Sequence, residues 1–158
     1  MKLLLLGSSG QLGWELQRSL SPLSKIFACD HNTADFNDLD NLKKLVRNYR
    51  PDVIVNAAAY TSVDKAESDA ENAFRVNSEA VDLLAKEAKA LASWLIHYST
   101  DYIFDGTKNG SYNEEDKTNP MSVYGKSKLQ GESAIIDSKC KYLIFRTSWL
   151  YSIYGNNF

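Results

Sequence analysis

Three glycines follow directly on an apolar run near the start of the chain. The run is Leu3–Leu6, and Gly7, Gly10 and Gly13 have the spacing G-x-x-G-x-x-G. In a strand that turns into a helix, the first glycine permits a tight turn, the second lets backbone approach a pyrophosphate, and the third lets the helix pack against the strand. The string alone also fits an ordinary turn. Its position after the first predicted strand favours a dinucleotide-binding loop.

Apolar segments alternate with helix-like segments along the rest of the chain. This order predicts an α/β fold: a Rossmann-type, doubly wound parallel sheet with helices on both faces and right-handed crossovers, incomplete at its C-terminal end. The predicted strands are 2–6, 25–30, 52–56, 94–99 and 142–146. The predicted helices are 11–20, 39–49, 64–91 (one long helix or two joined helices) and 123–136.

Composition excludes several classes of function. With 158 residues, of which 44% are hydrophobic, the chain can form one core, so residues 1–158 are expected to be one domain. A formal charge of -2 argues against a nucleic-acid partner. No apolar run is long enough for a membrane span or a signal peptide, which predicts a soluble, cytoplasmic protein. Cys29 and Cys140 are isolated and His31 and His97 lie far apart, so neither a disulfide nor a metal site is expected.

An acidic residue, Asp30, ends the second predicted strand. A carboxylate there can accept hydrogen bonds from an adenosine ribose, a geometry that usually favours NAD. Asp30 could equally cap a helix or form a turn, and no neighbouring arginine marks a site for a 2′-phosphate. The choice between NADPH and NADH therefore stays open.

Tyr124 and Lys128 lie four residues apart on a predicted helix, so their side chains project from one face. A free tyrosine titrates near ~10, and a neighbouring ammonium stabilises its phenolate and brings it closer to the range useful for acid-base catalysis. The spacing alone recurs by chance on exposed helices. The glycine turn upstream makes a catalytic pair the better interpretation.

Two further segments follow predicted strands, at the carboxyl edge of the sheet where ligands bind in open α/β folds. Thr100 and Asp101 follow the fourth strand, where a hydroxyl can hydrogen-bond a substrate carbonyl as negative charge develops. A capping turn explains the same two residues equally well. The segment 56–61 follows the third strand, and its small alanines would let backbone approach a cofactor or would simply pack tightly.

These pieces together resemble the extended short-chain dehydrogenase/reductases that act on nucleotide sugars. The resemblance covers nearly the whole chain. It is carried by LLLLGSSGQLGWELQ (3–17), PDVIVNAAAYTSVDKAESD (51–69), HYSTDYIFDG (97–106), YGKSKLQGE (124–132) and FRTSWLYS (145–152).

The resemblance implies that NADPH or NADH delivers a hydride to the C4 carbonyl of dTDP-4-dehydro-L-rhamnose, giving dTDP-L-rhamnose. It implies that Tyr124 protonates the developing alkoxide, that Lys128 lowers the tyrosine pKa and holds the nicotinamide ribose, and that Thr100 hydrogen-bonds the carbonyl. Asp101 and Trp149 match positions that contact the sugar, although Trp149 also fits a core aromatic. The implied cofactor-binding residues are Gly7, Gly10, Gln11, Leu12, Gly13, Asp30, Asp35, Phe36, Ala58, Ala59, Tyr60, Thr61, Tyr98, Tyr124 and Lys128.

The chain departs from this family in length, because its members are about twice as long and carry a separate substrate domain. We therefore expect a fragment that lacks this C-terminal domain, binds dinucleotide and reduces its substrate poorly or not at all. Two alternatives stay open: a non-catalytic dinucleotide-binding subunit, similar to the regulatory subunit of methionine adenosyltransferase, and another nucleotide-sugar epimerase or dehydratase. A dTDP-sugar is the expected partner, and a homodimer is an open possibility.

Overall fold

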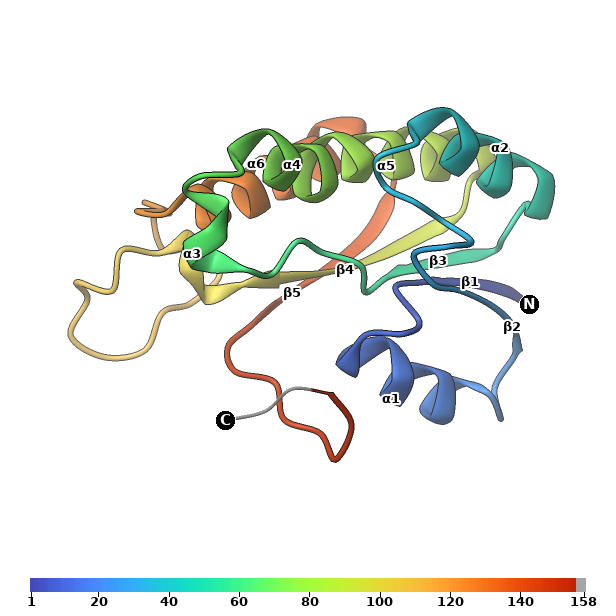
Figure 1. Ribbon diagram of the computed structural model, residues 1–158, viewed down its shortest axis with the longest axis horizontal. Helices are drawn as coiled ribbons and strands as arrows, with labels where there is room; N and C mark the ends of the chain where they lie inside the picture. The colour runs from blue at the N-terminus through green and yellow to red at the C-terminus, as the bar shows by residue number, and fades with distance from the viewer. Residues whose placement is uncertain (156–158) are drawn as a thin grey trace.

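Five parallel strands form one sheet in the spatial order β2-β1-β3-β4-β5 (Figure 1). The computed structural model describes residues 1–155, so the last three residues of the predicted domain lie outside the described part. The strands are β1 (Lys2–Leu6), β2 (Lys25–Cys29), β3 (Val53–Asn56), β4 (Trp94–Thr100) and β5 (Lys141–Thr147). The predicted fold class, a Rossmann-type parallel sheet, is confirmed.

Helices lie on both faces of the sheet (Figure 1). In Figure 1 α1 lies below the sheet, while α2, α4, α5 and α6 lie above it. The helices are α1 (Gln11–Leu20), α2 (Leu39–Tyr49), α3 (Val63–Ala66), α4 (Ala70–Phe74), α5 (Ala80–Leu91) and α6 (Val123–Ser138). On the side of α1, Leu143 and Phe145 of the edge strand β5 remain 47% and 46% exposed. Coverage of that face is therefore concentrated over β1 to β3.

The central strand β1 contributes to two apolar layers. Leu4 and Leu6 belong to the larger core, which contains residues of α2, α5 and α6. Leu3 and Leu5 belong to the smaller core, together with residues of α1. Because side chains alternate between the faces of a strand and both faces are covered here, β1 is a continuous apolar run.

The chain changes direction across the sheet at β1. From β1 it passes to β2 on one side, and it then returns to β3 on the other side of β1. The loops after β1 and β3 consequently leave the sheet toward opposite faces. In open parallel sheets the crevice between two such loops is the usual position of a ligand site.

The predicted helix over 64–91 is interrupted in the structure. It divides into α3, α4, a π-helical segment over Arg75–Glu79, and α5. The π-helical segment buries the polar side chains of Asn77 and Ser78. A pattern of Ala, Glu, Lys and Leu reports helix propensity but not these changes of winding.

Two boundaries that matter for the candidate site differ from prediction. The strand β2 ends at Cys29, so Asp30 lies just beyond the strand rather than at its last position. The strand β4 extends to Thr100, because β5 continues to pair with it up to Thr147. Thr100 is thus held by the sheet rather than by the loop that follows.

Candidate functional site

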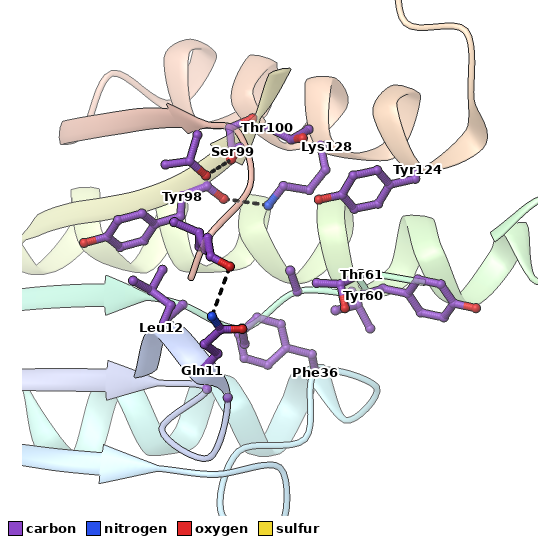
Figure 2. A pocket seen from close by; sticks show the side chains of 18 of the residues that line it. Gln11, Leu12, Phe36, Tyr60, Thr61, Tyr98, Ser99, Thr100, Tyr124 and Lys128 are labelled. Carbon is purple, nitrogen blue, oxygen red and sulfur yellow. Dashed lines mark hydrogen bonds between the residues drawn. The ribbon is translucent and has the colours of Figure 1, made fainter. Parts of the chain in front are cut away.

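A groove of about 680 Å³ lies at the carboxyl edge of the sheet, where the loops after β1 and β3 diverge. Figure 2 shows side chains from both sides of this groove, with Gln11 and Leu12 on one side and Tyr124 and Lys128 on the other. All but one of the predicted site residues line it. They are Gly7, Gly10, Gln11, Leu12, Asp30, Asp35, Phe36, Ala58, Ala59, Tyr60, Thr61, Tyr98, Thr100, Asp101, Tyr124, Lys128 and Trp149.

The three glycines of the loop differ in how much space surrounds them. Gly7 has a φ of +80°, and a Cβ there would lie 2.6 Å from the backbone nitrogen of Ala58. Gly13 does not line the groove; a Cβ on it would collide with the carbonyl oxygen of Gly7. Gly10 lines the groove and is the N-cap of α1, and a Cβ there would meet only the carbonyl of Gly7, at 3.4 Å. Gly7 and Gly13 are therefore required by packing, and Gly10 leaves space at the start of the helix.

Asp30 lies just after β2 and lines one end of the groove. Its carboxylate accepts hydrogen bonds from the backbone nitrogen of Thr33 at 2.9 Å and from the Thr33 hydroxyl at 2.8 Å. The hydrogen bond from the Thr33 hydroxyl is the main reason that the pKa of Asp30 is lowered. Asp30 is thus both a turn former and an anionic group lining the groove. The two interpretations that the sequence left open, a turn former and a carboxylate available to a ribose, are therefore compatible.

Asn77 is a buried residue that sequence reasoning missed. Its Oδ1 accepts from the backbone nitrogen of Tyr60 at 2.9 Å, and its Nδ2 donates to the Tyr60 carbonyl and to the Ser127 hydroxyl, each at 3.0 Å. Ser127 in turn donates to the carbonyl of Tyr124 at 2.7 Å. One amide therefore joins the loop after β3 to the helix that carries Tyr124 and Lys128.

Tyr124 lies in the first turn of α6, against the segment that follows β4. A Cβ on its neighbour Gly125 would collide with the carbonyl oxygen of Tyr102, so this glycine permits the close approach. The rings of Tyr102 and Tyr124 meet edge to face, with centroids 5.7 Å apart. Burial raises the pKa of Tyr124, a hydrogen bond with Thr100 lowers it, and the charge of Asp101 raises it. The net direction is upward, opposite to the lowering expected from Lys128.

Thr100 combines a structural contact with a place in the groove. Its hydroxyl accepts from the backbone nitrogen of Tyr102 and donates to the carboxylate of Asp101, both at 3.2 Å. Thr100 is the N-cap of the short 3₁₀ turn over Asp101–Ile103. The prediction that Thr100 caps a turn is therefore confirmed. The same residue lines the groove, and its hydroxyl lowers the pKa of Tyr124.

Lys128 is 1% exposed, although it is a long cationic side chain. Its Nζ donates to the carbonyl oxygen of Tyr98 at 2.7 Å (Figure 2). Burial lowers the pKa of Lys128 to about 8, while the charge of Glu132 acts in the opposite direction. The amine and ammonium forms therefore exchange near neutral pH.

The segment after β5 crosses the groove toward α1. The Nε2 of Gln11 donates to the carbonyl of Leu150 at 3.0 Å (Figure 2). The ring of Tyr154 stacks on Trp14 with centroids 5.0 Å apart. Trp149 lines the groove and is 63% exposed, so the core-aromatic alternative is wrong. Sequence reasoning missed the contact with Gln11, since no pattern relates positions 139 residues apart.

Two negative findings concern only residues 1–155. Among them, no group of three or more His, Cys, Asp or Glu side chains could hold a metal ion. No helix within the same range has the length and apolarity needed to cross a membrane.

Comparison with known proteins gives matches over the whole chain. A protein of Salmonella typhimurium named dTDP-4-dehydrorhamnose reductase is 52% identical over all of this chain and 54% of its own length. The crystal structure of dTDP-4-dehydrorhamnose reductase from Bacillus anthracis in complex with NADP has a TM-score of 0.95 and 36% identity, with 99% of this chain and 56% of that chain covered. A dTDP-4-dehydrorhamnose reductase structure from Clostridium acetobutylicum has a TM-score of 0.96 and 38% identity, covering all of this chain and 56% of that one.

The chain thus spans about half the length of the relatives that it matches. The family model described as "RmlD substrate binding domain" matches residues 1–158. This match extends over the glycine loop, the groove and the helix that carries Tyr124 and Lys128. The chain belongs to the RmlD substrate-binding domain family.

Proposed function

We propose that this chain is the dinucleotide-binding and catalytic portion of an NAD(P)H-dependent reductase that acts on the C4 carbonyl of dTDP-4-dehydro-L-rhamnose, giving dTDP-L-rhamnose. The observation that carries the proposal is the convergence of Thr100, Tyr124 and Lys128 on one groove that begins at a glycine loop. The names of relatives up to 52% identical over the whole chain support the choice of substrate. The proposal includes a cytoplasmic location, and a homodimer is the assembly to be tested.

The residues of the groove fit a dinucleotide. Gly7 and Gly13 have no room for a side chain, and Gly10 leaves the N-terminus of α1 open, which suits an anionic pyrophosphate. At one end Asp30 offers a carboxylate to ribose hydroxyls, beside Asp35 and the buried Phe36. The proposed holding residues are Gly7, Gly10, Gln11, Leu12, Asp30, Asp35, Phe36, Ala58, Ala59, Tyr60, Thr61, Tyr98 and Lys128, with Gly13 acting through packing.

When bound, the reduced dinucleotide supplies the hydride for the C4 carbon. Tyr124 then donates its hydroxyl proton to the carbonyl oxygen, which becomes the alcohol. Because burial raises the pKa of Tyr124, this group is protonated at neutral pH, as the acid in a reduction must be. Thr100 supplies a hydroxyl to the same oxygen, where negative charge develops.

Asp101 and Trp149 are the residues of the groove proposed to contact the sugar. Trp149 is exposed on the segment after β5 and can offer an aromatic face to a sugar ring. Asp101 already accepts from Thr100 and can accept from sugar hydroxyls with its remaining lone pairs. These two roles rest on the positions of the residues in the groove and on the family resemblance.

A dinucleotide-oxidation assay tests the proposal on the 158-residue chain and on any longer form of it. NADPH and NADH are each mixed with dTDP-4-dehydro-L-rhamnose, with a UDP-linked 4-keto sugar as control, and the product is identified by NMR. We expect oxidation that requires the dTDP-sugar, and dTDP-L-rhamnose as product. Dinucleotide binding without oxidation would support the regulatory alternative instead. Conversion of the sugar without net oxidation would support an epimerase or dehydratase.

A further inference from the structure

A buried row of three polar side chains lies behind the groove. His97 on β4 is 0% exposed. Its Nδ1 lies 3.2 Å from the Nδ2 of Asn56, and its Nε2 lies 3.4 Å from the Nζ of Lys128. Neither Asn56 nor His97 belongs to the machinery assigned above, yet His97 contacts the lysine directly and Asn56 contacts His97.

The orientation of the Asn56 amide follows from its second contact. Its Oδ1 accepts from the backbone nitrogen of Ala58 at 3.1 Å. Turning the amide would bring its NH₂ group against that N–H, so the NH₂ group must face His97. The Nδ1 of His97 is therefore the acceptor of this hydrogen bond.

The tautomer of His97 follows from the same contact. Burial lowers the pKa of His97 well below its ordinary value, and the charge of Lys128 lowers it further, so the ring is neutral. A neutral imidazole carries one proton, and with Nδ1 accepting, that proton is on Nε2. The ring thus directs an N–H donor at the Nζ of Lys128.

An ammonium and a neutral amine respond differently to this donor. An ammonium has three N–H groups and no lone pair, so it cannot accept the hydrogen bond. A neutral amine accepts it with its lone pair and can still donate to the Tyr98 carbonyl, 2.7 Å away. The contact with His97 therefore favours the amine.

We propose that His97, held by Asn56 with its proton on Nε2, is a positioning residue that favours the neutral amine form of Lys128 and holds its Nζ at the Tyr98 carbonyl. The inference rests on the proposed function only for its consequence in catalysis. In catalysis, His97 sets the pH above which Lys128 no longer carries the charge that orients a ribose and supports Tyr124. His97 acts through the lysine and needs no contact with substrate.

Other charged groups around Lys128 act beside His97. Glu132 on α6 is 1% exposed and favours the ammonium. Arg146 on β5 binds the Glu132 carboxylate at 2.8 Å. Tyr124 lies on α6, the same helix as Lys128. Asp101 lies after β4, and its charge raises the pKa of Tyr124. His97 differs from these groups in directing an N–H donor at Nζ, with 3.4 Å between its Nε2 and Nζ.

The tautomer can be read directly in the unmodified protein. Long-range ¹H–¹⁵N NMR of the protein, labelled with ¹⁵N-histidine, separates Nδ1–H from Nε2–H rings. We expect His97 to be the neutral Nε2–H tautomer at neutral and alkaline pH, because burial lowers its pKa well below the ordinary value. A ring with its proton on Nδ1 would overturn the proposal without any substitution.

Two substitutions test the effect on Lys128. In His97→Gln a side-chain carbonyl can accept from the ammonium, and in Asn56→Asp a carboxylate would draw the imidazole proton to Nδ1. Each should raise the pKa of Lys128 by about one unit, read from its ¹³Cε shift and assigned with Lys128→Arg. His31→Gln is the matched control, because that histidine is 74% exposed on its side chain, and it should leave the Lys128 pKa unchanged. An unchanged Lys128 pKa in a folded His97→Gln protein would refute the inference.

These readouts need neither substrate nor turnover, so they are independent of the proposed function. Where turnover is present, the alkaline limb of its pH profile should move upward by the same amount in His97→Gln. A fixed alkaline limb despite a shifted lysine pKa would remove the catalytic consequence. Absence of turnover in every form would count against the proposed function and would leave the NMR results as the test of His97.

Discussion

Lys128 donates its hydrogen bond to the backbone carbonyl of Tyr98, with 2.7 Å between Nζ and the oxygen. Through this contact α6 is joined to the carboxyl end of β4, and the cation is kept inside the protein beside His97. A buried ammonium with few partners costs stability. We therefore expect Lys128 to serve function while lowering the free energy of unfolding.

Lys128→Met tests this conflict. The folded protein holds the Lys128 proton with a pKa of about 8, and the ordinary value is 10.5, so the unfolded chain binds the proton more tightly. The unfolding free energy of the unmodified protein should rise between about pH 8 and pH 10.5, and below that window the ammonium is a cost in the folded state. We expect the variant to be more stable by about 1–2 kcal/mol at pH 7, after loss of the hydrogen bond is allowed for, and to lack this rise.

Chemical denaturation at pH 7 and pH 10 measures both quantities. A variant that is less stable at pH 7, or that keeps the same rise with pH, would contradict the assignment of a destabilising buried ammonium.

The glycine loop permits a comparison of two similar substitutions. In Gly13→Ala the new methyl group meets the Gly7 carbonyl, so we expect a loss of about 2–3 kcal/mol in unfolding free energy. In Gly10→Ala the methyl group has room in the fold but occupies the groove, so stability should hold while dinucleotide affinity falls about tenfold or more. Thermal denaturation and titration of dinucleotide fluorescence measure the pair. Equal effects of the two substitutions on binding and on stability would argue against separate roles.

The ion pair between Glu132 and Arg146 is a third subject for mutation. Glu132 is buried and accepts three hydrogen bonds from the Arg146 guanidinium. Glu132→Ala leaves the arginine without this partner and should cost about 3 kcal/mol. Lys86→Ala, which removes an exposed pair with Asp82, is the control and should cost less than about 0.5 kcal/mol. Urea denaturation would contradict the account if the two losses were similar.

Much of the architecture follows from local patterns in the sequence. The strand β1, the glycine turn and α1 were predicted at their observed bounds, because a buried central strand is continuously apolar and an amphipathic helix repeats its apolar positions. Tyr124 and Lys128 were predicted on one helix, and they line one groove with Thr100. Their catalytic roles remain predictions.

Other features depend on contacts that no local pattern encodes. His97 lies within an apolar strand, and its value as a partner of Lys128 appears only when β4 and α6 meet. The π-helical segment is tied to the hydrogen bonds of Asn77 with Tyr60 and Ser127. The pKa of Tyr124 is raised by burial, opposite to the lowering that was expected from Lys128. Burial is a property of the assembled fold.

Tyr124→Phe gives the most direct test of the central claim, that this groove carries out carbonyl reduction with Tyr124 as the acid. Two quantities are measured for the unmodified protein and for the variant, in this chain and in any longer form: steady-state oxidation of NADPH in the presence of dTDP-4-dehydro-L-rhamnose, and the dissociation constant of NADPH. We predict that turnover falls by about 100-fold or more while the dissociation constant changes less than about twofold. Unchanged turnover in a folded variant that binds NADPH normally would contradict the account.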